Sequence, residues 1–572
     1  KTLLERILDS VTKNDINKIV IVIGYKGENV VKLIGDRYNN TPVEYVNNKI
    51  YDKTNNIYSL YLAKDYLTSD DSILFESDLV FEDKIVSNLL SNPFPNLAVV
   101  AKFEPWMDGT VTTIDDDNLI TGFIPKSQMK YKRVDKYYKT VNIYKLSKEF
   151  CEKSFVPFLT AYTRSMGDNE YYEQVLRVIT FIEKQSLKAY PLTDEIWYEI
   201  DDIQDLNTAE LLLADEDKVL ELYQKRWGGY WRFPKLLDFC YLVNPYFPTK
   251  EMELEIMRSF SHLLHSYPSG INVQNLLAAK MFDLDQENIV VGNGAAELIR
   301  SLMNNLDGTF GISSPTFQEY PNRLQKERVK YFKPFIISNS PFYGFKELEM
   351  ISKEVDNVIL INPDNPSGNL VRKNDVIRLI ENLKKQNKRL ILDESFMDFA
   401  ENSSDESLLN YDLVKKYNNL IIVKSISKSY GIPGFRLGVI ISSDLEVISK
   451  TKGDVSIWNI NSFGEYFMQI FGKYQKDYIN SCKLIRAERD SFFEKLKCIK
   501  FLEVFPSHAN YFLCRVKEKF TATELTKLLL TKHNIFIKDL TNKPGLEKGE
   551  FIRIAVRNTS DNNTLINILL AL

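Results

Sequence analysis

The chain has 572 residues, which at about 150 residues per domain is more than one domain of ordinary size. Hydrophobic residues make up 44% and charged residues 26%, which is typical of a folded globular protein and excludes a disordered or coiled-coil chain. The 73 basic and 77 acidic side chains leave a net charge of −4, so no nucleic-acid partner is expected. The apolar runs fall far short of the ~20 residues that span a bilayer, so no membrane partner is expected either.

The five cysteines are scattered and form no C-x-x-C pair. This pattern indicates reduced thiols and predicts a cytoplasmic protein. Only four histidines occur, so acid–base chemistry is expected to depend on other groups. The sequence begins without Met and with an amphipathic helical pattern, from which we expect further residues upstream.

Helical and strand patterns alternate along the first hundred residues. Leu3–Val11 has helical spacing, whereas Lys18–Gly24, Ser72–Phe75 and Leu97–Phe103 are short apolar runs typical of strands. This βαβ alternation predicts an α/β fold with a mostly parallel sheet and helices on both of its faces.

A break near the middle of the chain predicts a domain boundary. Leu206–Trp227 reads as one helix, and the turn-rich segment Gly228–Pro234 follows it. After this segment the α/β alternation starts again, so the expected domains are residues 1–227 and 228–572.

Four segments of the second domain suggest linked chemistry. Glycines between a strand and a helix in Ile289–Glu297 could expose backbone N–H groups to a phosphate. The rigid loop Asn362–Gly368 could aim an asparagine, and Asp393 ends a buried strand, where α/β sheets bind ligands. Lys428 and Arg436 would suit a Schiff base beside a phosphate clamp. Taken singly, each segment also fits a turn, a helix cap or a surface lysine.

In order and spacing, these segments resemble the fold-type I pyridoxal-phosphate aminotransferases from about residue 236 to the end. The similarity is strongest to the histidinol-phosphate aminotransferase and threonine-phosphate decarboxylase branch. It implies a large α/β domain and a small α+β domain. It also implies that Lys428 forms the Schiff base with pyridoxal 5'-phosphate and moves the α-proton, while Asp393 holds the pyridinium.

The same resemblance implies the other contacts of the second domain. Arg553 would grip the carboxylate of the amino-acid donor, and Asn244 would also contact substrate. Tyr267 resembles the tyrosine that a neighbouring subunit lends, which implies a homodimer through this domain. The cofactor contacts implied by the family are Asn365 for the phenolic oxygen, Phe317 for ring stacking, and Ala295, Ala296, Ser425 or Ser427, and Arg436 for the phosphate.

One residue departs from the pattern of many relatives. Phe396 stands three residues after Asp393, where those relatives carry a tyrosine. Phenylalanine cannot donate a hydrogen bond to the phenolic oxygen of the cofactor. The decarboxylase branch tolerates this residue, so decarboxylation stays an alternative to transamination.

Acidic side chains follow strand patterns in the first domain. Asp78 ends the segment Glu76-Ser-Asp78, and Asp201 ends the segment Trp197–Asp201. Both aspartates could bind Mg²⁺ against a triphosphate, or they could belong to exposed acidic loops. The segment Lys130–Asn142 mixes cations with aromatic residues and is either a solvated face or a surface that attracts phosphates.

These features resemble the sugar-phosphate and phosphocholine nucleotidyltransferases, most of all the cytidylyltransferases that act on small phospho- or phosphono-headgroups. The family implies a Rossmann-like nucleotidyltransferase domain that uses CTP. The matching segments are Lys53–Leu60, Glu76–Asp78, Trp106–Thr110, Lys139–Asn142 and Trp197–Asp201.

The resemblance also implies roles for particular residues of this domain. Asp78 and Asp201 would carry Mg²⁺ with Glu199 nearby, and Lys139 would neutralise charge on the reacting phosphoryl groups. A substrate ammonium group would be accepted by charge and cation–π contact, unless the segment is only an amphipathic helix face. The residues implied for that group are Glu170, Tyr171, Tyr172 and Glu173, and those implied for the nucleotide are Asn56 and Ser59.

The family opens with a glycine-rich loop that ends in arginine, and this chain begins after the position of that loop. We expect the loop among upstream residues; without it the domain would not bind CTP normally.

Together the two domains resemble fusions of a phosphonate cytidylyltransferase with a 2-aminoethylphosphonate transaminase. The expected reactions are transamination of phosphonoacetaldehyde and transfer of CMP from CTP to 2-aminoethylphosphonate, with release of pyrophosphate. The alternatives are a threonine-phosphate-decarboxylase-like or histidinol-phosphate-like enzyme fused to a phosphocholine or sugar-phosphate nucleotidyltransferase, or to a degenerate regulatory module.

Overall fold

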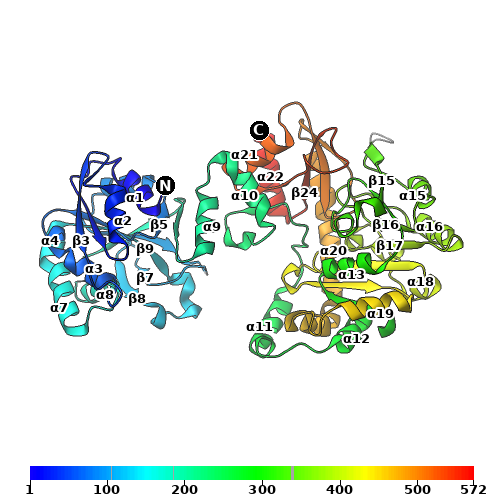
Figure 1. Ribbon diagram of the computed structural model, residues 1–572, viewed down its shortest axis with the longest axis horizontal. Coiled ribbons are helices and arrows are strands. Elements are labelled where there is room, and N and C mark those ends of the chain that lie inside the picture. Colours follow the sequence, from blue (N-terminus) through cyan, green and yellow to red (C-terminus); the bar gives the residue numbers. More distant parts are fainter. Residues whose placement is uncertain (105, 184–185, 336–339) are drawn as a thin grey trace. The chain divides into compact units, whose positions relative to one another are not determined.

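The computed structural model describes residues 1–104, 106–183, 186–335 and 340–572. The chain divides into two compact units, Lys1–Trp227 and Gly228–Leu572. The division falls where the sequence predicts the domain boundary. Figure 1 labels the helices and strands of both units.

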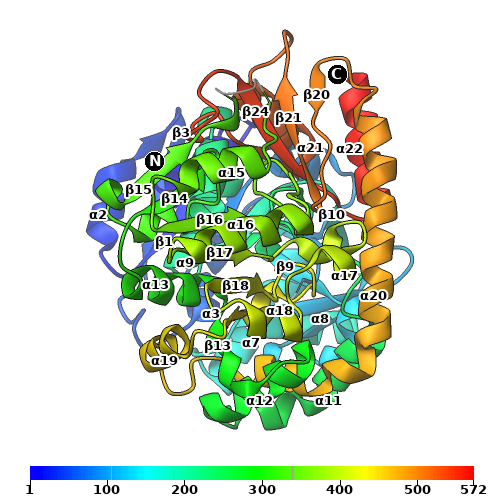
Figure 2. The same ribbon diagram turned by 90° about the vertical axis from the view of Figure 1, so that its right-hand side faces the viewer.

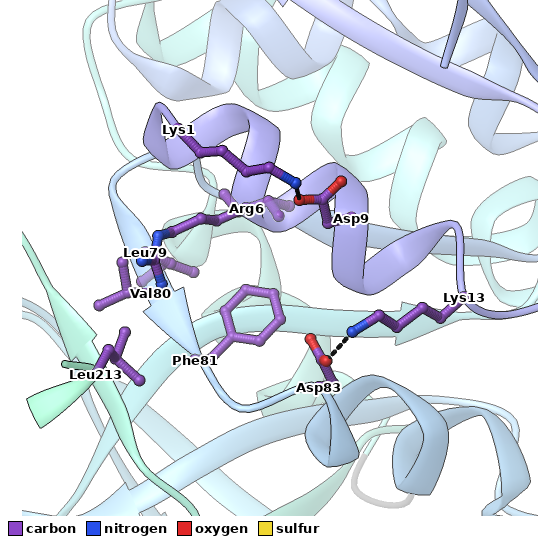
Figure 3. Close-up of a pocket in the computed structure, with 10 residues that line it drawn as sticks. Lys1, Arg6, Asp9, Lys13, Leu79, Val80, Phe81, Asp83 and Leu213 are labelled. Atoms are coloured by element: carbon purple, nitrogen blue, oxygen red, sulfur yellow. Dashed lines mark hydrogen bonds and ion pairs between the residues drawn. The ribbon is translucent and has the colours of Figure 1, made fainter. Parts of the chain in front are cut away.

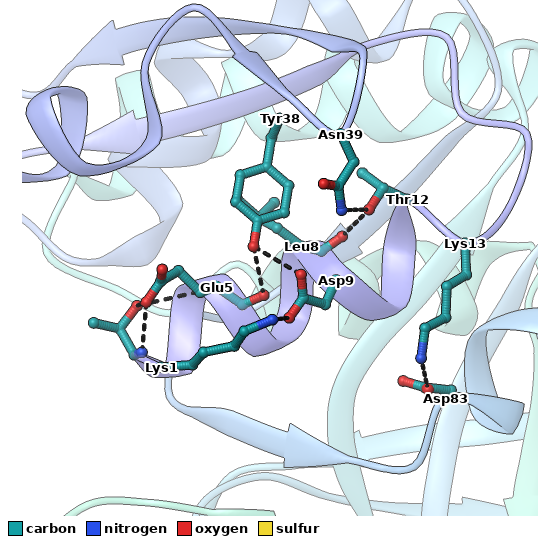
Figure 4. A network of polar contacts seen from close by, with 10 residues as sticks. Lys1, Glu5, Leu8, Asp9, Thr12, Lys13, Tyr38, Asn39 and Asp83 are labelled. Atoms are coloured by element: carbon teal, nitrogen blue, oxygen red, sulfur yellow. Dashed lines mark hydrogen bonds and ion pairs between the residues drawn. The ribbon is translucent and has the colours of Figure 1, made fainter.

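The first unit begins with a helix whose start is fixed by its own side chains. In α1 (Leu3–Val11), the Thr2 hydroxyl accepts a hydrogen bond from the Glu5 amide, and the Glu5 carboxylate accepts one from the Thr2 amide. This reciprocal capping satisfies two backbone donors that the first turn of a helix leaves free. The Tyr38 hydroxyl then ties α1 to the next hairpin by donating to Asp9 at 2.8 Å (Figure 4).

The strands of the first unit form separate sheets. A three-stranded sheet has the order β1-β3-β2, and a six-stranded sheet has the order β10-β6-β9-β7-β8, with β4 paired to β9. A third sheet pairs β5 with β11. The strands are β1 (Ile19–Ile23), β2 (Arg37–Tyr38), β3 (Thr41–Asn47), β4 (Ser72–Phe75), β5 (Leu79–Phe81), β6 (Leu97–Lys102), β7 (Val111–Ile114), β8 (Ile120–Ile124), β9 (Tyr138–Leu146), β10 (Lys188–Leu192) and β11 (Trp197–Glu199).

The prediction of a mostly parallel sheet is wrong for the first unit. In the six-stranded sheet only β10 and β6 run parallel, and β9 lies antiparallel to β4, β6 and β7. The sequence predicts a surface segment over Lys130–Asn142, but its last residues belong to β9, and Lys139–Tyr144 are buried. The cations before β9 hide its apolar pattern, which is why the central strand was missed.

The helices of the first unit lie between and beside these strands. They are α2 (Gly27–Ile34), α3 (Asn56–Leu62), α4 (Lys64–Leu67), α5 (Lys84–Ser91), α6 (Lys148–Phe150), α7 (Val156–Met166), α8 (Glu173–Ile182), α9 (Ile203–Leu212) and α10 (Glu216–Arg226). The helix expected over Leu206–Trp227 is in fact α9 and α10. Asp215 has an extended ψ of 141°, which ends one helical run and starts another.

The second unit is built on a seven-stranded sheet of order β13-β19-β18-β17-β16-β14-β15. Its strands run parallel except β19, which is antiparallel to β13 and β18. This confirms the predicted α/β class for the second unit. The strands are β13 (Ile289–Asn293), β14 (Phe310–Ser313), β15 (Val329–Phe332), β16 (Asn357–Ile361), β17 (Arg389–Asp393), β18 (Leu420–Ser425) and β19 (Leu437–Ile441).

Helices cover both faces of this sheet because side chains alternate along each buried strand. Ile391 of β17 packs with α13 (Ala295–Asn305) and α19 (Leu445–Asp454). Its neighbour Leu392 packs on the opposite face with α16 (Lys373–Lys385). The remaining helices are α11 (Lys250–Leu264), α12 (Ile271–Phe282), α15 (Phe345–Ser352), α17 (Ser403–Glu406) and α18 (Tyr411–Lys416).

A small domain completes the second unit. Its sheet has the order β20-β21-β24-β23, and a short pair joins β12 to β22. The long helix α20 (Ser462–Leu496) runs between two cores, with Phe467 in the core of the large sheet and Phe492 in that of the small domain (Figure 2). The other elements are β12 (Leu237–Asp238), β20 (Leu502–Val504), β21 (Tyr511–Val516), β22 (Ile535–Phe536), β23 (Lys538–Asp539), β24 (Glu550–Ala555), α21 (Ala522–His533) and α22 (Thr559–Ala571).

Among the described residues, no helix is both long enough and apolar enough to cross a membrane.

Candidate functional site

Lys428 lies in the turn that follows β18, at the carboxyl end of the large sheet. Its ammonium is 4.5 Å from the centre of the Phe396 ring and 5.5 Å from that of Phe317. Burial lowers the pKa of Lys428; the charge of Asp393 opposes this, and Arg553 and Arg436 add to it. A lowered pKa increases the fraction of Lys428 that is a neutral amine, which is the form that reacts with a carbonyl group.

Asp393 is the last residue of β17 and is buried. One carboxylate oxygen accepts a hydrogen bond from the Tyr320 hydroxyl at 2.8 Å, and the other accepts from the Ser395 amide at 2.9 Å. The two donors fix the carboxylate beside Lys428. This arrangement could hold a protonated ring nitrogen of a cofactor. The sequence did not indicate this contact of Tyr320, although Tyr320 lies only three residues after Phe317.

Asn365 and Arg553 meet in the structure although 188 positions separate them. The Arg553 guanidinium donates to Asn365 Oδ1 at 2.8 Å and to the Cys240 carbonyl at 2.8 Å. Its Nε atom is buried and has no hydrogen-bond partner. That free donor leaves Arg553 able to bind a carboxylate, and its role in substrate binding stays a prediction.

The predicted phosphate site lies at the start of α13. Gly294 precedes Ala295 and Ala296, and a side chain at Gly294 would come within 2.5 Å of the Arg436 guanidinium. The Ser427 hydroxyl is buried without a partner, and the Ser425 amide donates to Ser395 Oγ at 2.9 Å. A helix N-terminus, an arginine and an unpaired hydroxyl fit a phosphate group, so this donor set suits pyridoxal phosphate.

Asn244 and Tyr267 make contacts that the sequence did not predict. The side-chain amide of Asn244 donates to the Ser429 carbonyl and to Ser481 Oγ, both at 2.9 Å, so it braces the turn that carries Lys428. Tyr267 is 79% exposed and stacks on Trp458, with the ring centres 4.4 Å apart.

The first unit holds a separate cluster of acids. Carboxylate oxygens of Glu76, Asp78 and Glu199 lie within 4.8 Å of one another, an arrangement that suits a metal ion. One Asp78 oxygen is buried without a hydrogen-bond partner. Asp201, the other predicted ligand, is exposed and is not part of this group, although its charge contributes to the raised pKa of Asp78. The structure therefore groups Glu76 and Glu199 with Asp78, whereas the sequence predicted Asp201 as the second metal ligand with Glu199 nearby.

Asn142 holds the acid cluster together. Its side-chain amide donates to Glu76 and to Glu199, each at 3.0 Å, and its backbone carbonyl accepts from the Glu76 amide. Asn142 lies inside β9 with a φ of +59°, a left-handed conformation that asparagine tolerates better than most residues. The bend aims its side chain at both carboxylates. Nothing in the sequence pattern indicated this conformation.

Lys139 provides a buried positive charge beside these acids. Its ammonium pairs with Glu199 at 3.0 Å and donates to the Thr140 carbonyl at 2.8 Å. Gly109, with a φ of +88°, lies above it, and a side chain there would come within 3.5 Å of the Lys139 ammonium. Gly109 of the segment Trp106–Thr110 therefore lies close to the Lys139 ammonium.

The predicted ammonium-binding residues separate into two pairs. Glu170 and Tyr171 are exposed, whereas Tyr172 and Glu173 are buried at the start of α8. The Tyr172 amide donates to Asn56 Oδ1, and Asn56 Nδ2 donates to Glu76, both at 3.0 Å. Asn56 therefore joins the start of α8 to the acid cluster.

Ser59 lies one helical turn beyond Asn56 in α3. Its hydroxyl accepts a hydrogen bond from the Asn48 amide at 3.2 Å, and Asn48 also donates to the Thr54 hydroxyl at 3.1 Å.

Burial of the acids raises their pKa values. Burial, with the charges of Glu173 and Asp78, raises the pKa of Glu76 to about 8. Burial raises the pKa of Glu173 to about 7, and it also raises the pKa values of Asp78 and Glu199. A bound cation would stabilise the charged forms of these buried carboxyl groups.

A pocket of about 310 Å³ opens between α1 and β5 of the same unit (Figure 3). Among its charged residues, Lys1 pairs with Asp9 at 2.5 Å and Lys13 pairs with Asp83, and Arg6 also lines the pocket. Both of its acids are thus already paired, so the pocket offers no group comparable to the acid cluster.

Comparison with known proteins identifies the family of the second unit. Residues 239–569, more than half of the chain, match the family model for class I and II aminotransferases. The chain therefore belongs to that family, whose cofactor is pyridoxal phosphate. Two solved structures are similar: a decarboxylase from Sulfurospirillum multivorans (TM-score 0.54, 32% identity, 60% of this chain and 89% of that one) and the histidinol-phosphate aminotransferase from Clostridium acetobutylicum (TM-score 0.52, 29% identity, 59% and 98%).

One relative is similar to both units. The CMP-5'-(3-aminopropyl)phosphonate synthase of Streptomyces rubellomurinus is 28% identical over 557 residues, which cover 96% of this chain and 87% of the relative. An L-serine phosphate decarboxylase of Campylobacter jejuni is 31% identical over 346 residues, 58% of this chain and 87% of the relative.

Proposed function

We propose that the protein is a bifunctional enzyme of phosphonate biosynthesis. The second unit transaminates phosphonoacetaldehyde to 2-aminoethylphosphonate, using an amino-acid donor. The first unit transfers CMP from CTP to that product and releases pyrophosphate. The observation that carries this proposal is the similarity, over 96% of the chain, to a synthase of a CMP-aminoalkylphosphonate. We also propose a cytoplasmic location, from the scattered cysteines, and a homodimer, because Tyr267 is exposed and so could reach a partner subunit.

In the second unit, the residues around Lys428 would have different roles in transamination. Pyridoxal phosphate, when bound, supplies the electron sink that stabilises negative charge on the substrate carbon. Asp393 would hold its ring nitrogen protonated, and Ser427 and Arg436 would hold its phosphate. The Lys428 amine, whose pKa burial lowers, accepts the α-proton of the substrate and returns it. Arg553 orients the substrate through its carboxylate.

In the first unit, the acid cluster and Lys139 surround the reacting phosphates. Asp78, Glu199 and Glu76 would hold Mg²⁺, which neutralises charge on a triphosphate. A phosphonate oxygen attacks the α-phosphorus of CTP in line, the new P–O bond forms, and pyrophosphate leaves with the electrons of the broken bond. Lys139 offsets the negative charge that develops, and no covalent intermediate with the protein is needed.

The ammonium group of the acceptor would be bound at the start of α8. Glu173 is 5% exposed and one of its oxygens has no hydrogen-bond partner. Tyr172 and Tyr144 meet edge to face beside it, with ring centres 5.7 Å apart. A buried carboxylate beside aromatic rings is a common environment for an organic cation.

Two assays test the proposal on the same preparation. Pyrophosphate release is measured with CTP, Mg²⁺ and 2-aminoethylphosphonate, with phosphocholine and a sugar phosphate as competing acceptors. Formation of 2-aminoethylphosphonate is measured with phosphonoacetaldehyde and a panel of amino acids. Asp78→Asn should strongly reduce the first activity and Lys428→Ala the second. Absence of pyrophosphate release above a blank without acceptor would refute the cytidylyltransferase assignment.

Decarboxylation is the second candidate for the second unit. It is favoured by the similarity to L-serine phosphate decarboxylases, at 31% and 32% identity, and by Phe396, which cannot donate a hydrogen bond to the cofactor. Release of carbon dioxide from O-phosphoserine or O-phosphothreonine, without transfer of the amino group, would establish this candidate in place of transamination.

A further inference from the structure

The turn that carries Lys428 is in contact with a second segment of the same site, residues 393–398. This segment begins with Asp393 at the end of β17 and continues into the short 3-10 helix Met397–Phe399. It also contains Phe396, whose ring centre lies 4.5 Å from the Lys428 ammonium. Two side chains of the segment therefore face the cofactor site, and two others contact the turn itself.

Ser395 and Asp398 hold the turn on either side of Lys428. Before Lys428, the Ser425 amide donates to Ser395 Oγ at 2.9 Å. After Lys428, the Ser429 hydroxyl donates to Asp398 Oδ2 at 2.9 Å. Ser429 is fully buried, and a hydrogen bond to a charged acceptor is stronger than one between neutral groups. One segment thus fixes both ends of the turn.

Asp398 is paired with a buried lysine. The Lys424 side chain of β18 is 3% exposed, and its ammonium lies 2.6 Å from the same Asp398 Oδ2 atom and 3.3 Å from the Glu394 carbonyl. The Glu394 carboxylate, which also lies near Lys424, accepts a hydrogen bond from the Leu408 amide at 2.7 Å. On the other side, the Arg486 guanidinium donates to the Asp398 carbonyl at 3.0 Å. The Asp398 carboxylate is therefore fixed in place by contacts of its own.

The backbone around Asn244 holds the turn from another direction. The Lys428 carbonyl accepts a hydrogen bond from the Asn244 amide at 2.9 Å, and the Ser429 carbonyl accepts one from the Asn244 side chain at 2.9 Å. A side chain at Gly431, where φ is +67°, would come within 1.7 Å of the Phe247 carbonyl oxygen, so the turn packs directly on this backbone. The peptide group that follows Lys428 is therefore held from two sides.

We propose that Asp398 is a positioning residue for Lys428 and that it acts through the Ser429 hydroxyl. An amine that must reach a bound cofactor works only from an accurately placed backbone, and a displacement of about 1 Å can cost about 100-fold in rate. A buried ion pair adds little net stability, but the pair of Lys424 and Asp398 gives Ser429 a fixed, charged acceptor. The inference rests on the proposed role of Lys428 and applies to transamination and decarboxylation alike.

The test compares Ser429→Ala, Asp398→Asn and their double variant with the control Ser442→Ala in the full chain. Ser442 is 1% exposed, and its hydroxyl donates to the carbonyl of Leu420 at the start of β18 at 2.8 Å. The control therefore removes an equally buried hydrogen bond at the opposite end of the same strand.

Two measurements separate the position of Lys428 from the integrity of the pocket. The first is the rate at which visible absorption appears when pyridoxal phosphate is mixed with cofactor-free protein. The second is the dissociation constant of pyridoxamine 5'-phosphate, which fits the same pocket but has no carbonyl group with which Lys428 could react. The unfolding temperature of each variant is recorded beside them.

We expect Ser429→Ala to slow the appearance of the absorption by about 10- to 100-fold and to change pyridoxamine phosphate binding by less than about threefold. Ser442→Ala should leave both constants within about twofold of the wild type. Both serine variants should lower the unfolding temperature by similar amounts, since each loses one buried hydrogen bond. The double variant should be no slower than Asp398→Asn alone, because the aspartate acts through the serine.

An unchanged rate in Ser429→Ala, or an equal loss of pyridoxamine phosphate affinity, would overturn the inference. Losses that multiply in the double variant would do the same, because Asp398 would then act independently of Ser429. A visible absorption that persists in Lys428→Ala would refute the proposed role of Lys428 itself. That failure is detected without any variant of Ser429 or Asp398.

Discussion

The acid cluster of the first unit and the Lys428 pocket of the second have opposite electrostatic compositions. Glu76, Asp78, Glu173 and Glu199 surround one buried lysine in the first unit, and burial raises the pKa values of all four acids. In the second unit burial lowers the pKa of Lys428, and Asp393 is the acid that faces it.

The difference indicates what each site lacks. The first site is short of positive charge, so it suits a metal ion and a substrate ammonium group. The second site has positive charge in excess, so it suits the phosphate of a cofactor and anionic substrates. One aminoalkylphosphonate can serve both sites because it carries a cation at one end and a dianion at the other.

The largest expected effect is the loss of one activity while the other is retained. Lys428→Ala should reduce transamination by at least about 10³-fold, because it removes the amine that we propose to bind the cofactor and to move the α-proton. The visible absorption of the bound cofactor should change at the same time. Pyrophosphate release from CTP should stay within about twofold of the wild type, since its groups lie in the other unit. A parallel loss of both activities would contradict this independence.

Asp78→Asn tests the acid cluster in the same way. Removing a ligand with a free buried oxygen should lower the CTP-dependent activity by about 10²- to 10³-fold at fixed Mg²⁺. Raising the Mg²⁺ concentration should recover part of it. Asp201→Asn should have the smaller effect, because Asp201 is exposed and outside the cluster. A larger loss in Asp201→Asn than in Asp78→Asn would instead support Asp201 as a metal ligand, as the sequence predicts.

Glu173→Gln tests whether the first unit binds the ammonium group of its acceptor substrate. The KM for 2-aminoethylphosphonate should rise about 10-fold, the value of one charged hydrogen bond, and kcat should change little. The exposed Glu170→Gln is the matched control and should behave as the wild type does. A 2-hydroxyethylphosphonate acceptor, which lacks the cation, should not distinguish the two variants from the wild type.

The stability of the first unit should depend on pH. Because the folded pKa values of Glu76 and Glu173 are raised to about 8 and about 7, the folded state holds protons that the unfolded chain releases. The free energy of unfolding therefore falls as pH rises from about 5 to 8, by an amount that lowers the unfolding temperature by roughly 5 °C. Calorimetry with and without Mg²⁺ checks this, since the ion should stabilise more at pH 8 than at pH 6. A free energy of unfolding that does not change over this pH range would mean that the pKa values of these acids are not raised in the folded protein.

Phe396→Tyr should have the smallest effect. The Phe396 ring meets Tyr511 edge to face at 5.1 Å and lies under the Lys428 ammonium. A hydroxyl at this position could donate to the phenolic oxygen of the cofactor and shift the pH midpoint of its visible absorption down by up to about one unit. A spectrophotometric pH titration measures it, and an unchanged midpoint would show that the added hydroxyl does not reach the cofactor.

The sequence by itself determined the class and cofactor of the second unit. Asp393 and Lys428 lie at or just after apolar runs typical of buried strands, and the order and spacing of these segments carry the resemblance to the fold-type I pyridoxal-phosphate enzymes that implied the cofactor. Local pattern and chemistry therefore agree there, and the predicted fold and cofactor are supported by the aminotransferase family match. The sequence also indicated the break at Gly228, because glycine and aromatic residues interrupt a helical pattern.

Only the tertiary structure decided how the groups of the first unit meet. Asn142 joins Glu76 to Glu199 by adopting a left-handed conformation inside β9, and that strand lies antiparallel to its neighbours instead of continuing the βαβ alternation. Likewise Tyr320, Asn365 and Arg553 reach their partners across long intervals of sequence. A pattern read along the chain reports local periodicity, whereas pairings between distant strands depend on packing that no single segment encodes.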